Sequence, residues 1–134
     1  MRLYIAGPVT GLAEGNYPAF EYAAKRLFDA GHLPVLPPEL RTALQPTAEM
    51  SLGQCYRKVI PADIVELATC DGMIVLPGFE KSQGTAFELH GAELFDMEVY
   101  RPAWASDEFP GGLSEWMDVI LDMIDVDRVM RVGS

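Results

Sequence analysis

The chain has 134 residues, of which 49% are hydrophobic and 22% are charged, a balance typical of a single folded globular domain. Its formal net charge is −10 at pH 7. This charge disfavours binding to a nucleic-acid backbone, which requires clustered lysine and arginine. An anionic small ligand remains compatible with it, because backbone N–H groups and hydroxyls can hold a phosphate without a basic surface.

The chain opens on the strand-like run Arg2-Leu3-Tyr4-Ile5-Ala6, which does not have the pattern of a signal peptide. No apolar run approaches the roughly 20 residues that a membrane-spanning helix needs. Cys55 and Cys70 suit neither a metal knuckle nor a disulfide framework, so we expect two reduced cysteines on buried helix faces. Together these features predict a cytoplasmic protein with no membrane partner, no cofactor and no metal.

Short apolar segments, most of them closed by proline or glycine, predict the strands. We expect strands over residues 3–6, 32–36, 72–76 and 98–101. Gly7-Pro8 ends the first segment and Pro77-Gly78 ends the third. Because these two strands are strongly apolar, we expect both to be fully buried.

Apolar residues recur at helical spacing between the strands. We expect helices over residues 16–30, 51–69, 85–95 and 113–124. Asn16 and Ser51 are candidate N-caps, and Gly31 is a candidate stop. Pro61 should kink its helix or begin a second segment, because proline lacks an N–H and clashes with the preceding turn.

Alternating strands and helices predict one α/β domain over residues 1–134, with a doubly wound, Rossmann-like or flavodoxin-like parallel sheet of four or five strands. Residues 39–50 and 102–112 are expected to be loops, and the first is long enough to form a wall or lid over a pocket. Ligands in such folds bind at the carboxyl ends of the strands, where the strand order reverses. The glycine-bearing segments 7–11 and 77–84 are therefore the first places to look.

The segment Ser82-Gln83-Gly84-Thr85-Ala86-Phe87-Glu88 follows a strand and opens a helix. We expect Glu88 in the first helical turn, where the positive helix end favours a negative charge. It either serves only that helix end or, being flanked by apolar residues, is a semi-buried functional carboxylate. Tyr4 is the only polar-tipped side chain in its strand segment, and a buried phenol requires a partner such as Glu88.

Asp63 follows Pro61 closely, so it is either an ordinary carboxylate after a helix break or a second functional acid. Asp71 is expected to form a turn. His32 and His90 lack a second metal ligand at useful spacing. No Walker A sequence, GxGxxG or nucleophile elbow is present, which disfavours kinases, nicotinamide enzymes and serine hydrolases.

The ordered set Tyr4-Ile5-Ala6-Gly7-Pro8, Asp63 with Asp71, and Ser82…Gly84…Glu88 resembles the nucleoside 2-deoxyribosyltransferase superfamily. More narrowly, residues 2–100 resemble the DUF4406 branch common in phages and prophages. The resemblance implies cleavage of an N-glycosidic bond, with Glu88 as the nucleophile and Tyr4 orienting it. It also implies that Asp63 assists at the base or activates the incoming nucleophile.

The resemblance also suggests a substrate. Transferases acting on free nucleosides usually have an acid where this chain has Ser82, which favours a (deoxy)nucleoside 5′-monophosphate and its hydrolysis. Ser82 and the backbone of Gly84 would hold the phosphate at a helix N-terminus. The loop after the first strand would contribute Gly7, Pro8, Thr10 and Gly11. That loop lacks the arginine that such hydrolases often carry, and residues 104–134 do not match the terminal region of the transferases.

Two other functions stay open on the sequence alone. One is a nucleoside 2-deoxyribosyltransferase that exchanges bases. The other is a non-catalytic nucleotide-binding or sensor module that keeps the pocket without turnover. In each case the expected partner is a small-molecule nucleoside or nucleotide, and the resemblance implies a homodimer or a higher homo-oligomer.

Overall fold

The computed structural model describes residues 1–9, 12–38, 51–103 and 111–132. Within them lies one parallel sheet in the order β2-β1-β3-β4. Its strands are β1 (Arg2–Ala6), β2 (Leu33–Val35), β3 (Gly72–Val75) and β4 (Glu98–Tyr100). All four strands stand within about two residues of their predicted positions.

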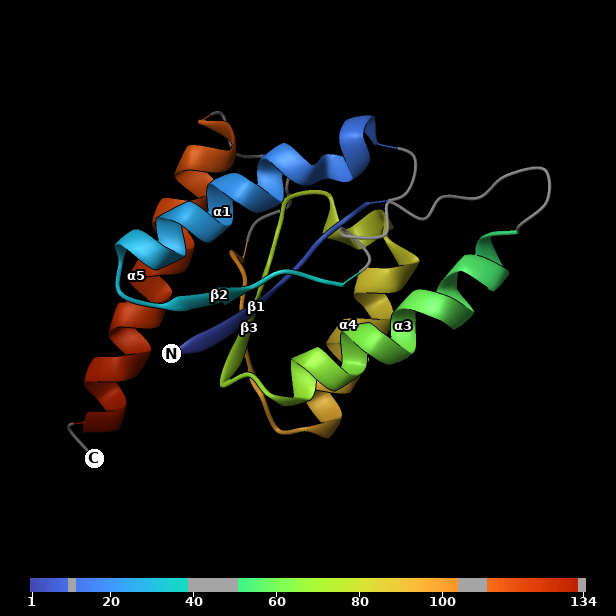
Figure 1. The fold of residues 1–134 in the computed structure, drawn as a ribbon. Coiled ribbons are helices and arrows are strands. Elements are labelled where there is room, and N and C mark those ends of the chain that lie inside the picture. Colours follow the sequence, from blue (N-terminus) through green and yellow to red (C-terminus); the bar gives the residue numbers. More distant parts are fainter. Residues whose placement is uncertain (10–11, 39–50, 104–110, 133–134) are drawn as a thin grey trace.

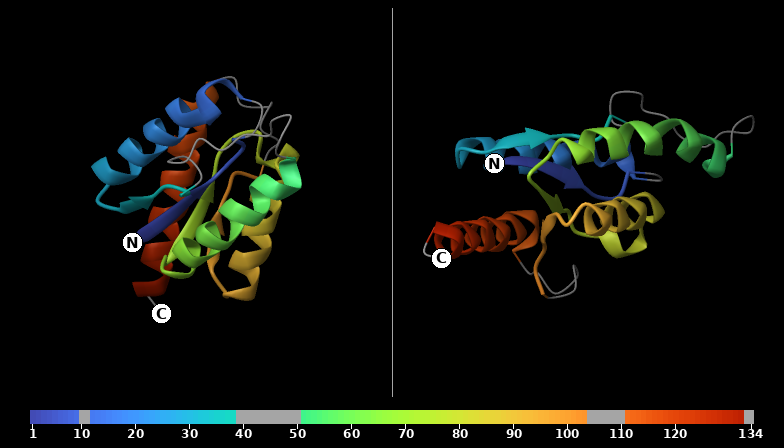
Figure 2. Two further views of the ribbon diagram at one scale, coloured as in Figure 1. Left: turned by 45° about the vertical axis from the view of Figure 1, so that its right-hand side comes forward. Right: turned by 90° about the horizontal axis from the view of Figure 1, so that it is seen from below.

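Helices cover both faces of the sheet (Figures 1 and 2). One face carries α1 (Tyr17–Asp29) and α5 (Gly112–Val132), and the other carries α3 (Leu52–Ala68) and α4 (Gln83–Leu94). Two short 3₁₀ turns, η1 (Ala13–Asn16) and η2 (Phe79–Lys81), precede α1 and α4. The predicted doubly wound α/β fold is therefore confirmed. None of the helices in the described part of the chain is both long and apolar enough to cross a membrane.

The central strand β1 presents its two faces to different helix pairs. Successive side chains of a strand point to opposite faces. Arg2 bonds to residues at the end of α3, and Tyr4 bonds to Glu88 of α4. The even-numbered side chains of β1 therefore lie under α3 and α4, while Leu3 and Ile5 face α1 and α5.

The strand order reverses between β1 and β3. From β1 the chain passes over one face through α1 to β2, and from β3 it passes over the other face through α4 to β4. Ala6 of β1 pairs with Val75 of β3, and the Leu76 N–H donates to the Ala6 carbonyl at 2.8 Å. The segments after these strands consequently lie side by side, as expected at the ligand-binding edge of such a sheet.

Local helix signals were predicted with mixed success. Ser51 caps α3 as expected: its Oγ accepts from the Gln54 N–H at 3.2 Å, and the Gln54 side chain accepts from the Ser51 N–H at 2.8 Å. Gly31 ends α1 with a positive φ of 90°. Asn16 precedes α1 but makes no side-chain cap bond. Its Nδ2 instead donates to the Pro8 carbonyl at 3.0 Å, which ties the start of α1 to the loop after β1.

Two helices differ from the predictions made from their sequence patterns. α3 continues as one element through Pro61, so the expected second segment does not exist. α5 continues to Val132, well beyond the predicted end at residue 124. Its last turns are held to the sheet edge, because the Tyr100 hydroxyl donates to Asp127 at 2.7 Å and Arg131 pairs with Glu98. The first predicted loop, residues 39–50, lies outside the described residues, as do residues 104–110 of the second.

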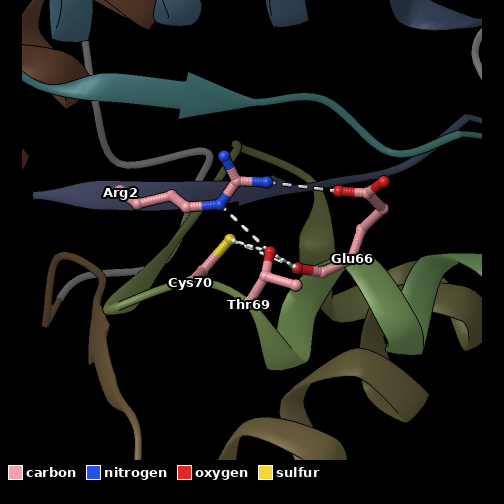
Figure 3. A network of polar contacts seen from close by, with 4 residues as sticks. All are labelled: Arg2, Glu66, Thr69 and Cys70. Carbon is pink, nitrogen blue, oxygen red and sulfur yellow. Dashed lines mark hydrogen bonds and ion pairs between the residues drawn. The ribbon is translucent and has the colours of Figure 1, made fainter.

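A polar network fixes the amino-terminal end of the sheet, away from the reversal point (Figure 3). Arg2 Nε donates to Thr69 Oγ1 at 3.0 Å, and its guanidinium pairs with Glu66 at 3.4 Å. Asp71 extends the pairing of β1, because its N–H donates to the Arg2 carbonyl and its carboxylate accepts from the Arg2 N–H. Cys70 is free, as expected, but lies after α3 and not on a helix face, and its Sγ donates to the Glu66 carbonyl.

Gly7 tests how closely the segments after β1 and β3 must approach. A Cβ at Gly7 would lie 2.8 Å from Leu76 Cβ, so Gly7→Ala should lower the free energy of unfolding by about 1–3 kcal/mol. Gly53→Ala is the matched control. It lies inside α3 with only Ser51 Oγ at 3.9 Å, and should raise stability by about 0.5–1 kcal/mol. Urea denaturation measures both, and equal stability of the two variants would contradict the close approach.

Candidate active site

Tyr4 and Glu88 form the centre of the candidate site. The Tyr4 hydroxyl donates a hydrogen bond to Glu88 Oε2, which joins the central strand to α4. Both side chains are buried, with exposed fractions of 0% and 1%. The predicted pairing of the strand phenol with this carboxylate is confirmed.

The position of Glu88 in its helix differs from the prediction. Ser82 caps α4, since its Oγ accepts from the Thr85 N–H at 3.1 Å, and the helix begins at Gln83. Glu88 is therefore the sixth residue and lies in the second turn, beyond the reach of most of the helix-end effect. The Tyr4 hydroxyl is a hydrogen-bond donor that the structure places directly on this carboxylate.

Asp63 is the second buried carboxylate, with an exposed fraction of 0%. It lies well inside α3 with Val59 and Leu67 one turn away on either side, so the interpretation as a helix-terminal carboxylate is wrong. α3 packs on α4, where a Cβ at Gly91 would lie 3.1 Å from Ile64 Cδ1. The two acids thus lie on adjacent helices that cover the same face of the sheet. Burying a carboxylate costs several kcal/mol before its partners are counted, which favours a functional reason for each.

Thr85 is a buried polar residue near Glu88 that the sequence analysis did not single out. Its side chain is fully buried, and its Oγ1 has no hydrogen-bond partner among the described residues. A buried hydroxyl without a partner costs about 1–3 kcal/mol. Thr85 precedes Glu88 by three residues, so both lie on the same side of α4. The sequence offered one signal for Thr85, namely its position between the cap Ser82 and the candidate nucleophile Glu88.

Two of the predicted phosphate-binding residues, Gly7 and Pro8, follow β1 and lie next to the segment after β3 at the carboxyl edge of the sheet. Gly7 lies against Leu76, and the position of a Cβ at Gly78 is 3.4 Å from the Pro8 ring. Gly84 is the second residue of α4, so its backbone N–H is among those that a helix leaves without an internal partner. Thr10 and Gly11, the remaining predicted contacts, lie outside the described residues.

A hollow of about 390 Å³ lies between the first halves of α3 and α4. It is lined by Gly53, Tyr56, Arg57, Ile60, Pro61, Gln83, Gly84 and Phe87. These α4 residues lie away from the sheet, and neither Thr85 nor Glu88 lines the hollow. It is therefore a groove on the outer side of the helix pair.

The two histidines do not belong to the candidate site. His90 is exposed, and His32 is buried before β2, where burial lowers the pKa of its imidazole. Among the described residues, no group of three or more histidine, cysteine, aspartate or glutamate side chains is placed to hold a metal ion. The buried polar side chains under α3 and α4 are thus carboxylates and hydroxyls.

Residues 1–101 match the family described as "Domain of unknown function (DUF4406)". The chain belongs to this family. The matched region contains β1 to β4 and every candidate site residue, and it leaves out α5. A search of curated proteins gives no match to the chain. The DUF4406 domain thus contains the complete candidate site, whereas α5 adds a helix to the opposite face of its sheet.

Removing one oxygen tests the central contact. Tyr4→Phe deletes the donor to a buried carboxylate and should lower the free energy of unfolding by about 1–3 kcal/mol. Tyr100→Phe is the matched control, because its partner Asp127 is partly exposed and also binds Arg131; it should cost about 1 kcal/mol or less. Chemical denaturation compares the two variants. An equal or smaller loss for Tyr4→Phe would show that the Glu88 contact does not stabilise the fold.

Proposed function

We propose that this DUF4406 protein hydrolyses the N-glycosidic bond of a deoxynucleoside 5′-monophosphate. The observation that carries the proposal is the buried hydrogen bond between Tyr4 and Glu88, which holds a carboxylate beside the point where the strand order reverses. This contact fixes the orientation of a carboxylate in a buried position. The ordered motifs shared with the nucleoside 2-deoxyribosyltransferase superfamily point to the same bond.

In the proposed reaction, a Glu88 oxygen attacks C1′ through an oxocarbenium-like transition state. The C1′–N bond breaks, its electron pair stays on the base nitrogen, and Asp63 supplies the proton that the base takes. Water then attacks C1′ and gives a proton to Asp63, while the bond from C1′ to Glu88 breaks. The products are the free base and deoxyribose 5-phosphate, and both carboxyl groups return to their starting forms.

The 5′-phosphate is assigned to the carboxyl edge of the sheet. The Ser82 oxygen already accepts from the Thr85 N–H, which leaves its hydroxyl proton able to donate to a phosphate oxygen. The first backbone N–H groups of α4, including that of Gly84, point the same way. Gly7, Pro8, Thr10 and Gly11 would close the phosphate site from the β1 side. The mechanism requires no cofactor.

The burial of the acids favours one alternative from another class. Glu88 and Asp63 are almost completely shielded from solvent, which suits a nucleotide-binding or sensor module that does not turn over its ligand. A base-exchanging transferase uses the same first half of the mechanism and differs only in the second nucleophile. The nucleotide ligand, the homodimer or higher homo-oligomer, the phage or prophage setting and the cytoplasmic location remain predictions.

Release of free base decides between these functions. The four deoxynucleosides and their 5′-monophosphates are incubated with the native chain, and products are separated by chromatography. We expect base release from monophosphates, lowered at least about 1,000-fold by Glu88→Gln, which removes the nucleophile but keeps its size. Glu93→Gln is the matched control on the exposed side of α4 and should retain native activity.

The other outcomes are distinct. Product formation only when a second base is added would identify a transferase. Binding of nucleotides without release of base would identify a binding module. Base release that persists in Glu88→Gln would refute Glu88 as the nucleophile.

A further inference from the structure

Thr85 and Glu88 are hydrogen-bonding side chains on the buried face of α4, and of these two only Glu88 has a hydrogen-bond partner among the described residues. Glu88 accepts from Tyr4, whereas Thr85 Oγ1 has no partner among the described residues although its side chain is fully buried. Threonine in a helix commonly bonds back to a carbonyl of the preceding turn, and here the hydroxyl does not. An unused buried hydroxyl in a native structure calls for an explanation, and a bound ligand is one.

Thr85 lies midway between the two ends of the proposed site. Ser82, Thr85 and Glu88 are separated by three residues each, or about 4.5 Å along the helix axis per step. If Glu88 meets C1′ and Ser82 meets the 5′-phosphate, the pentose ring falls alongside Thr85. Glu88 and Thr85 are buried to the same degree, so an opening that admits a substrate to one admits it to the other.

We propose that Thr85 is a sugar-binding residue whose hydroxyl hydrogen-bonds the 3′-hydroxyl of the substrate. This inference rests on the proposed function for the placement of the sugar. In a 2′-deoxynucleoside 5′-monophosphate, the 3′-hydroxyl is the only free hydroxyl of the sugar. Both hydroxyls can donate and accept, so either direction of the hydrogen bond satisfies the pair.

The test deletes the hydroxyl on each side of the contact. Binding of a 2′-deoxynucleoside 5′-monophosphate and of its 2′,3′-dideoxy counterpart is measured by calorimetry on three proteins: the Glu88→Gln parent, and this parent with Thr85→Val or Thr85→Ser added. A Glu88→Gln background prevents turnover during the measurement. We expect the protein with Thr85 to bind the nucleotide that has a 3′-hydroxyl about tenfold or more tightly than the dideoxy nucleotide. Thr85→Val, which keeps the shape but not the hydroxyl, should lose most of this preference, and Thr85→Ser should keep it.

The melting temperature of Thr85→Val separates a ligand-binding role from a structural one. A purely structural role of the hydroxyl would make the variant melt at a lower temperature than the native chain. Thr85→Val should melt at the same temperature as the native chain or higher, because an apolar group replaces a hydroxyl without a partner. A clear fall in the melting temperature would show that the hydroxyl is used within the protein and would overturn the proposal.

The binding outcomes separate this proposal from the proposed function. If Thr85→Val discriminates between the two ligands as strongly as its parent does, the proposed role of Thr85 is wrong, even if base release is observed. Loss of discrimination in Thr85→Val supports that role even if the native chain releases no base. Failure of both nucleotides to bind overturns the proposal, and base release by the native chain then decides separately whether the glycosidase survives.

Discussion

The hydrogen bond from Tyr4 to Glu88 is the contact on which the candidate site depends. It joins residues 84 positions apart in the sequence and ties α4 to the central strand of the sheet. A carboxylate this deeply buried is tolerated only when hydrogen-bond donors replace its water. The position of Glu88 is thus coupled to the register of β1, and a shift of either element would leave a buried charge poorly solvated.

The order of the strands turns this contact into a site. Tyr4 pairs across the sheet with Met73, so the phenol lies on the central strand pair whose loops meet where the order reverses. α3 and α4 cross the same face and bring Asp63 and Glu88 over it, while α1 and α5 close the other face with an apolar core. Trp116 of α5 is part of that core, and its Nε1 donates to the Val75 carbonyl at 2.8 Å. This bond holds the end of β3 from the face that carries α1 and α5. The polar face is therefore supported by a rigid apolar one.

The sequence predicted those features that depend on neighbouring residues or on an unavoidable physical requirement. Ser51 could be recognised as a helix cap, and Tyr4 needed a partner because a phenol in an apolar strand must be satisfied. The depth of Glu88 in α4 was missed, because the Ser82 cap starts the helix before its best helix-forming residues. Asn16 occupies the predicted N-cap position, but its side chain bonds to the Pro8 carbonyl instead of the helix, because the folded chain brings that carbonyl close. The unused hydroxyl of Thr85 could not be predicted, since counting partners requires the packed structure.

The central claim is that Glu88 becomes covalently bonded to the sugar, and mass spectrometry of a quenched reaction tests it most directly. The chain is mixed with a deoxynucleoside 5′-monophosphate, quenched with acid within milliseconds to seconds and digested. The account predicts a peptide containing Glu88 that carries the added mass of a deoxyribosyl 5-phosphate group, and no such adduct in Glu88→Gln. Base release with the added mass on Asp63, or with no adduct at any quench time and inversion at C1′, would contradict it.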